Sequence, residues 1–140
     1  MPMIDVYAAA GTFADKRKLL QDLNQALMRW EKVPPLALFL DNTAAFLHEM
    51  PSGSFATARG ESRSVRVQIL TPVGILDREK KLGVTRELTE IVAAAAGDPS
   101  LAQRTWVLIA EAPDGGWGLG GHAYTNAEIA ETARRELTRK

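Results

Sequence analysis

The sequence contains no cysteine, which excludes disulfide bonds, thiolate catalysis and cysteine-ligated zinc. It has no excess of charge, because Lys plus Arg and Asp plus Glu both number 17 in 140 residues. This balance provides no net field to attract nucleic acid or an anionic membrane, so we expect neither as a partner. The chain has no apolar run of about 18 residues and no basic stretch at its start. We therefore expect a cytoplasmic protein without a signal peptide or membrane span.

Other common site motifs are also missing. The two histidines, His48 and His122, lie far apart and have no metal-ligand spacing, and we expect no metal and no cofactor. The sequence places His48 in or beside an irregular loop. The glycine-rich run 115–121 lacks the Lys-Ser/Thr of a P-loop, so it predicts a tight hairpin. No Gly-x-Ser-x-Gly sequence supports a serine hydrolase.

The first half of the chain reads as a strand, a helix and a second strand. Residues 2–8 form a short apolar strand that ends before Gly11. From Ala14 the apolar residues recur at helical spacing, with Thr12 or Asp15 as the cap. Pro34 and Pro35 end this helix, because the residue before a proline avoids the helical region. A second strand is predicted at about 36–40, and pairing is expected to resume around 44–47.

The same order returns in the second half. Residues 64–70 alternate as a strand, Asp77 caps a helix that ends at residues 97–99, and residues 105–110 form another strand. The halves align, with Gly11 matching Gly74. This internal repeat predicts two β-α-β units that share one core, since one unit buries little apolar surface alone.

The expected architecture is α+β, with two β-α-β repeats forming one four-stranded mixed sheet and two helices on one face. A C-terminal hairpin and a short helix complete it. We expect a single domain over residues 1–140, with repeat one at about 2–49, a linker at 50–63 and repeat two at 64–121. The final helix is expected at 125–138, where Thr125 and Glu128 form a capping box.

Three features together resemble the tautomerase superfamily, typified by 4-oxalocrotonate tautomerase and macrophage migration inhibitory factor. Met1-Pro2 leads directly into an apolar strand, the β-α-β unit occurs twice, and residues 106–111 lead into the hairpin sequence 116–121. The likeness covers residues 2 to about 121. The layout of two fused units with an extended C-terminus looks most like cis-3-chloroacrylic acid dehalogenase. The resemblance implies a tautomerase/MIF-like fold, a small-molecule substrate and a homotrimer with sites between or beside subunits.

The resemblance implies that Pro2, exposed by removal of Met1, is the catalytic base. Methionine aminopeptidases accept small second residues, which suits removal. A secondary amine is rigid, and burial in an apolar pocket or a nearby arginine would lower its pKa toward neutrality. Such a base can take a proton from the carbon beside a carbonyl and return it elsewhere. The structural alternative is that Pro2 only begins an edge strand.

Other site residues are expected from the resemblance and from residue type. Trp117 matches the hairpin aromatic that packs against substrate in the family. Tyr7 and Trp106 are expected to line a pocket, and Arg104 to hold a substrate carboxylate. The family's usual arginine positions carry Thr12 and Trp106 in this sequence.

Two further arginine positions of the dehalogenase fall on Pro72 and Ile75. Its water-activating Glu and Tyr fall on Leu119 and Leu108. We therefore expect keto-enol tautomerisation of a small 2-oxo or enol acid. The alternatives are a hydrolytic dehalogenase or decarboxylase of a small unsaturated or oxo acid, and an inactive trimeric binding protein.

Overall fold

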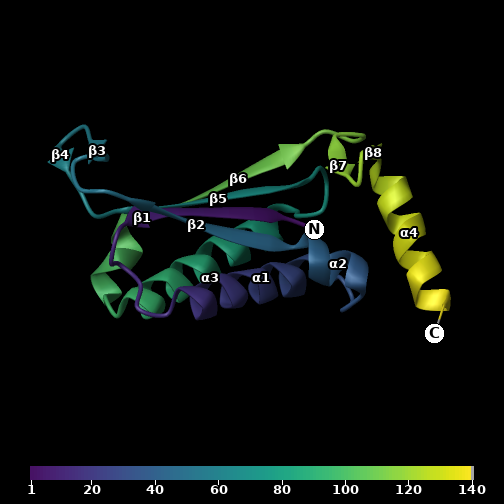
Figure 1. Ribbon diagram of the computed structural model, residues 1–140, viewed down its shortest axis with the longest axis horizontal. Coiled ribbons are helices and arrows are strands. Elements are labelled where there is room, and N and C mark those ends of the chain that lie inside the picture. Colours follow the sequence, from purple (N-terminus) through teal and green to yellow (C-terminus); the bar gives the residue numbers. More distant parts are fainter. Residues whose placement is uncertain (140) are drawn as a thin grey trace.

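The computed structural model describes residues 1–139, which build one four-stranded sheet with helices against one face (Figure 1). The sheet order is β2-β1-β5-β6, with β1 at Met3–Ala9, β2 at Ala44–Met50, β5 at Val65–Pro72 and β6 at Thr105–Ala112. β1 and β2 are parallel, as are β5 and β6, and the two pairs meet antiparallel between β1 and β5. The predicted α+β fold with a mixed sheet is confirmed.

Two long helices cover the same face of the sheet, as predicted (Figure 1). Helix α1 (Lys16–Glu31) begins where the Asp15 side chain accepts a hydrogen bond from the backbone N–H of Lys18. Helix α3 (Arg78–Ala96) begins in the same way, with the Asp77 side chain accepting from the N–H of Lys80. Each carboxylate satisfies an N–H that has no partner within its helix.

The two repeats use the same turn between strand and helix. Gly11 has φ 84° after β1, and Gly74 has φ 80° after β5. This left-handed conformation carries little steric cost for glycine, which has no Cβ. The sequence alignment of these two glycines therefore corresponds to a shared backbone geometry.

The main core lies between the sheet and the two helices. Its fully buried side chains come from alternate strand positions and from the inner helix faces: Ile4, Val6, Val67, Ile69, Leu19, Leu23, Leu27, Val84, Leu88 and Val92. The helices approach closely at Gly83, where an added Cβ would lie 2.1 Å from the Trp30 ring. A side chain at position 83 is therefore incompatible with the present place of that ring.

The predicted strand at 36–40 is wrong. Residues Ala37–Asn42 form a short helix, α2, and the strand starts only at Ala44. Leu36 and Phe39 are buried while Leu40 is exposed, which is helical spacing rather than strand alternation. Leu, Ala and Phe in a short apolar run do not by themselves separate helix from strand.

The segment between the repeats, expected to be an irregular linker, contains a small hairpin of β3 (Ala56–Thr57) and β4 (Gly60–Glu61). It lies at the end of the sheet opposite the N-terminus (Figure 1). The 3-10 helix η1 (Pro99–Arg104) connects α3 to β6. No helix in residues 1–139 combines the length and apolar character needed to cross a membrane.

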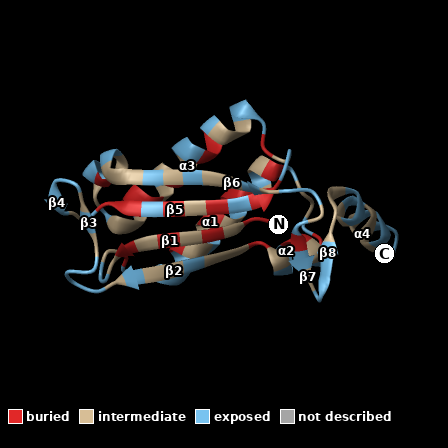
Figure 2. Ribbon diagram, turned by 90° about the horizontal axis from the view of Figure 1, so that it is seen from above, coloured by how far each residue is buried: buried red, intermediate tan, exposed pale blue. Residues whose placement is uncertain are grey.

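The C-terminal part confirms the predicted hairpin and helix. Strands β7 (Trp117–Leu119) and β8 (His122–Tyr124) pair antiparallel around Gly120-Gly121, both with positive φ. Helix α4 (Asn126–Thr138) follows, with the predicted capping box. Glu136 joins α4 to α2, because its carboxylate accepts hydrogen bonds from the backbone N–H groups of two α2 residues. These elements gather beside the N-terminus (Figure 2).

The second face of the sheet carries no helix. Four large apolar side chains on it are substantially exposed: Phe46 at 50%, Leu70 at 39%, Trp106 at 42% and Leu108 at 46%. They occupy alternate positions on three strands, pointing away from the helices. We call this the open face; Figure 2 views the sheet from that side. Polar side chains lie between them, since Phe46 is paired with Asp5, Trp106 with Arg66 and Leu108 with Gln68. A sheet face with several large exposed apolar side chains is a candidate contact surface for another protein.

Candidate active site

Pro2 lies buried immediately before β1, and its carbonyl accepts a hydrogen bond from the N–H of Ala44 at 3.2 Å. This bond joins the start of the chain to the start of β2. Met1 is attached in this structure, so the nitrogen of Pro2 is an amide and the free amino group belongs to Met1. Pro2 as a base therefore remains a prediction for the processed chain.

A second, smaller core surrounds the N-terminus. It consists of the buried residues Met1, Leu36, Phe39 and Trp117, and we call it the N-terminal cluster. Partly buried side chains from α1, the hairpin and α4 pack around it, including Met28, Tyr124 and Ile129. The start of β1 is therefore surrounded by packed apolar side chains.

One carboxylate enters this apolar region. Oε1 of Glu31, the last residue of α1, lies 2.9 Å from the amino nitrogen of Met1, and both partners are only 1% exposed. Oε2 of the same carboxylate accepts a hydrogen bond from the hydroxyl of Thr71 at 2.7 Å. Thr71 is fully buried at the end of β5. Both oxygens of Glu31 are thus engaged, which a buried carboxylate requires.

Trp117 is the predicted pocket residue that the structure brings to the N-terminus. It begins β7, is 7% exposed and packs in the N-terminal cluster with Met1. The hairpin turns this side chain inward because β7 and β8 pair tightly around two glycines.

Tyr7 and Trp106 lie elsewhere in the chain, on the open face. Tyr7 is five residues along β1 from Pro2, about 16 Å at strand spacing. Its ring stacks on His48 with centroids 4.3 Å apart, and the Arg66 guanidinium lies 5.4 Å from the ring centroid. Tyr7 and Trp106 share a small cavity of about 150 Å³ beside the inter-repeat segment. Within one chain they do not meet Pro2.

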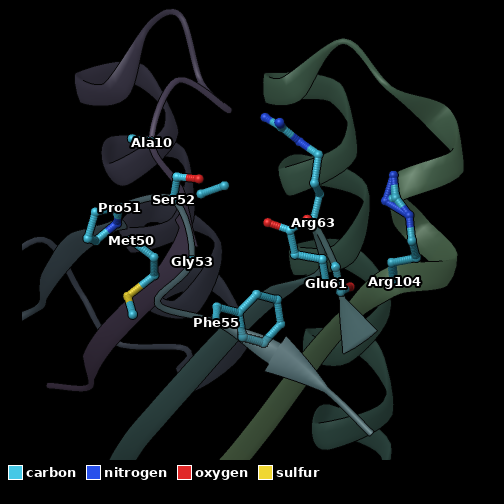
Figure 3. Close-up of a pocket in the computed structure, with 11 residues that line it drawn as sticks. Ala10, Met50, Pro51, Ser52, Gly53, Phe55, Glu61, Arg63 and Arg104 are labelled. Atoms are coloured by element: carbon cyan, nitrogen blue, oxygen red, sulfur yellow. The ribbon is translucent and has the colours of Figure 1, made fainter. Parts of the chain in front are cut away.

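Arg104 lies at the same far end, where a larger cleft of about 680 Å³ opens under the inter-repeat segment (Figure 3). We call this the far-end cleft; Arg63, Arg104, Glu61, Ser52 and Phe55 are among its lining residues. The far-end cleft is larger than the cavity that Tyr7 and Trp106 share. It lies at the opposite end of β1 from Pro2, so its volume alone does not identify it as the active site.

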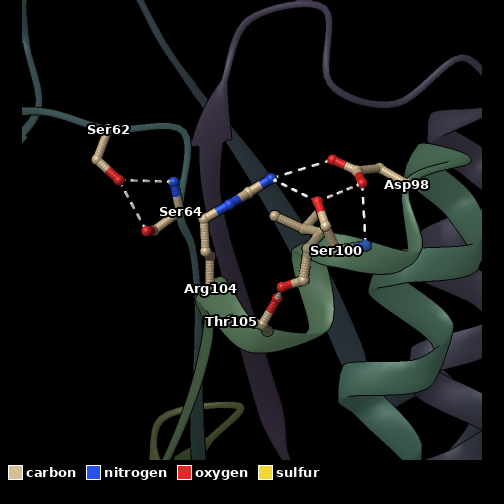
Figure 4. Close-up of polar contacts among 7 residues, drawn as sticks. Ser62, Ser64, Asp98, Ser100, Arg104 and Thr105 are labelled. Atoms are coloured by element: carbon tan, nitrogen blue, oxygen red, sulfur yellow. Dashed lines mark hydrogen bonds and ion pairs between the residues drawn. The ribbon is translucent and has the colours of Figure 1, made fainter.

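The guanidinium of Arg104 is only partly occupied. Its Nη2 donates to Asp98 at 3.0 Å and to the hydroxyl of Ser100 at 3.4 Å (Figure 4). Its Nη1 is buried and has no hydrogen-bond partner among residues 1–139. Hydrogen bonds from Ser100 and then from Arg104 hold the pKa of Asp98 below its ordinary value. Arg104 is thus held in place with one donor group still unused.

Sequence reasoning missed Glu31 and Thr71. Glu31 continues the spacing of Leu19, Leu23 and Leu27 along the buried stripe of α1. Thr71 continues the alternation of Val65, Val67 and Ile69 on the buried face of β5. In both cases a polar residue occupies a position where the repeat of apolar residues expects a buried side chain. Such a residue is expected to be buried rather than solvated, and this could have been seen in the sequence.

The two histidines also differ from expectation. His48 lies inside β2 rather than in an irregular loop, and its Nε2 is 2.7 Å from the carboxylate of Asp5. His122 is 2.6 Å from the carboxylate of Glu128. In each case the carboxylate comes from a neighbouring element. Asp5 lies on β1 beside β2, and Glu128 lies on α4 beside β8. The spacing of these residues in the sequence does not reveal the contacts. Within residues 1–139, no group of three His, Asp or Glu side chains gathers as a metal site.

The fold is that of an α+β protein of two β-α-β repeats closed by a hairpin, with Pro2 buried just before β1. Residues 64–127, the second repeat and the hairpin, match the family model described as Tautomerase enzyme. No curated protein matches the sequence. The family match over residues 64–127 and the shared fold support a relationship to the tautomerase superfamily.

Three solved structures illustrate the likeness. One is F6 fused 4-OT, an asymmetric trimer, with 25% identity, 86% of this chain and 94% of that chain covered, and a TM-score of 0.72. Another is Pt0534 inactivated by 2-oxo-3-pentynoate, with 20% identity, coverage of 89% and 97%, and a TM-score of 0.73. The third is N1, a member of the cis-3-chloroacrylic acid dehalogenase family, with 16% identity, coverage of 99% of both chains and a TM-score of 0.73. The last two show the common fold alone.

Proposed function

We propose that the protein is a tautomerase that transfers a proton between the keto and enol forms of a small 2-oxo or enol acid. Pro2, freed by removal of Met1, is the general base in this proposal. The observation that carries it is the placement of the N-terminus, buried at the start of β1 beside Trp117 in a chain related to the tautomerase superfamily.

Removal of Met1 would place a secondary amine beside the N-terminal cluster. The Met1 side chain, 4% exposed, now fills the space between Leu36, Phe39 and Trp117. Once that side chain has left, the same walls can enclose a small organic acid, with Trp117 packing against it. Apolar walls with few polar groups are typical of small-molecule sites.

The remaining predicted residues would come from a neighbouring chain. Tyr7, Trp106 and Arg104 lie at the opposite end of the sheet from Pro2, so one chain alone does not assemble the site. The open face supports association, and the F6 fused 4-OT relative is a trimer. In a homotrimer, the exposed part of the Arg104 side chain of one subunit, which is 37% exposed, would meet the substrate carboxylate held at Pro2 of another.

A trimeric protein without catalysis is the second candidate. It is favoured by one observation: the family's usual arginine positions carry Thr12 and Trp106 in this chain. A chain that keeps Met1 could bind partners through the open face but would have no basic nitrogen at Pro2.

Intact-mass analysis of the purified protein and ketonisation assays with phenylenolpyruvate and 2-hydroxymuconate separate the candidates. The proposal expects loss of Met1, measurable ketonisation, and a rate reduced by about 100-fold or more in Pro2→Ala. Pro2→Ala keeps a small second residue, so Met1 is still removed, and the rigid secondary amine of the ring is replaced by a flexible primary amine. Retained Met1, or equal rates in the two proteins, would favour the non-catalytic candidate.

A further inference from the structure

Glu31 is a buried carboxylate with no role in the proton transfer proposed above. Its side chain is 1% exposed and lies at the inner end of α1, beside the N-terminal cluster. A carboxylate withdrawn from water is costly unless it is paired and hydrogen-bonded. In this structure the Met1 amino group and the Thr71 hydroxyl meet that requirement.

Removal of Met1 takes away the charged partner of Glu31. The new amino group on Pro2 is separated from the old one only by the Cα and carbonyl carbon of Met1. Thr71 would still hold the second carboxylate oxygen, so Glu31 would remain aimed at the N-terminus. The Pro2 amine would then be the new N-terminal cation close to the oxygen that Met1 has released.

We propose that, after Met1 removal, Glu31 accepts a hydrogen bond from the Pro2 amine and is the counter-ion for its protonated form. This inference rests on the proposed function, because both need a free Pro2 nitrogen. Glu31 acts through Pro2 and is a positioning residue.

Among the side chains around the N-terminus, Glu31 is the charged group expected to affect the protonation of Pro2. The buried residues of the N-terminal cluster, Met1, Leu36, Phe39 and Trp117, are apolar. Tyr124 of β8 packs at its edge. Glu136 of α4 approaches α2, but its carboxylate oxygens accept from the backbone N–H groups of Ala37 and Leu38. A single amine and a single carboxylate thus face each other in an apolar setting.

The chemistry of the pair follows from this arrangement. Neutral Pro2 takes a proton from the substrate carbon, and the ammonium that forms is stabilised by Glu31 until the proton is returned. The protonated Pro2 amine is therefore always buried next to the negative charge of Glu31. The carboxylate also repels a substrate carboxylate, which must therefore point away from Glu31. It would then point toward the cation supplied by the neighbouring chain.

The test measures how the free-amine fraction of Pro2 depends on pH. The probe is 2-oxo-3-pentynoate, the compound that inactivates the structural relative Pt0534. A neutral amine adds to the alkyne carbon conjugated with the ketone; one π bond breaks, an N–C bond forms and the amine proton moves to the adjacent carbon. Nothing leaves, so the chain gains the full mass of the reagent, and peptide mapping locates the added mass.

Labelling rates are compared for processed wild type, Glu31→Gln and Thr71→Val. Removal of the carboxylate charge should lower the pKa of Pro2, moving the midpoint of the labelling profile down by about one to three pH units in Glu31→Gln. Thr71→Val keeps the carboxylate and should move the midpoint much less. An unchanged midpoint in folded Glu31→Gln overturns the inference.

The failures of the two proposals remain distinguishable. If Pro2 is labelled and the midpoint moves, but no ketonisation occurs, the pair exists and the proposed activity is wrong. If Pro2→Ala abolishes ketonisation but Glu31→Gln leaves the midpoint in place, the activity stands and the pair is wrong. If Glu31→Gln does not fold, ¹⁵N-proline NMR of the wild type decides. Coupled titration of the Pro2 nitrogen and the Glu31 carboxyl supports the pair, and independent titration overturns it.

Discussion

The amino nitrogen of Met1 lies 2.9 Å from Oε1 of Glu31, and both partners are almost completely withdrawn from solvent. This contact fixes the start of the chain at the inner end of α1, beside the hairpin residue Trp117. A polar contact therefore lies inside an apolar cluster. This is the place where the superfamily resemblance implies a catalytic proline.

Gly83→Ala should destabilise the fold, because the new Cβ would collide with the Trp30 ring between α1 and α3. Overpacking of this kind costs about 1–3 kcal/mol, partly offset by the better helix propensity of alanine. Urea unfolding measures the change in the free energy of unfolding. The double variant Gly83→Ala/Trp30→Leu should recover part of the loss, and additive losses would contradict the collision.

Trp117→Ala should reduce both stability and substrate affinity, because this side chain is 7% exposed and forms a wall of the N-terminal cluster. Truncation of a buried aromatic costs about 3–5 kcal/mol. Trp117→Phe keeps an aromatic wall and should lose much less. Chemical unfolding and KM are measured for both; an alanine variant as stable as wild type would show that Trp117 does not support the cluster.

Leu108→Arg should break the oligomer, because it places a charge in the apolar open face. Leu82→Arg is the matched control, since Leu82 is similarly exposed at 51% but lies on α3, away from the open face. Sedimentation velocity should show a trimer for wild type and for Leu82→Arg, and a smaller species for Leu108→Arg. A trimer that survives Leu108→Arg would move the interface elsewhere.

Asp98→Asn should weaken the acid dependence of stability. Ser100 and Arg104 hold the pKa of Asp98 below its ordinary value of 3.8, so the carboxylate stabilises the folded state above that value. This contribution is lost as the pH falls through the lower folded-state pKa. The difference in unfolding free energy between wild type and Asp98→Asn should therefore be largest near neutrality and shrink in acid.

Asp41→Asn is the control for this measurement, since Asp41 is an exposed aspartate on α2, away from Ser100 and Arg104. Its difference from wild type should change little with pH. A difference for Asp98→Asn that stays constant into acid would contradict the assigned contacts.

Most of the fold was predictable because local patterns and the global fold agree. The alternation in β5, the apolar stripes of α1 and α3 and the paired glycines Gly11 and Gly74 all predict elements that the structure contains. The error at 36–40 arose because a short apolar run fits a strand or a helix equally well. There the contact with Glu136, far along the chain, supplies the hydrogen-bond acceptor for the start of α2.

The site was less predictable, because its geometry depends on pairings that spacing does not encode. Trp117 meets the N-terminus through the hairpin. Glu31 and Thr71 converge only because α1 packs under β5. Arg104 points into a cleft whose other wall is the inter-repeat segment. Its relation to Pro2 depends on a neighbouring chain, which no pattern within one chain can specify.

The measurement that tests the central claim most directly is ketonisation by protein whose N-terminal residue has been established by intact mass. The account predicts that chains beginning at Pro2 ketonise phenylenolpyruvate, and that Pro2→Ala, equally processed and folded, loses about 100-fold or more of that rate. Ketonisation at the wild-type rate by Pro2→Ala, or by chains that retain Met1, would contradict the account.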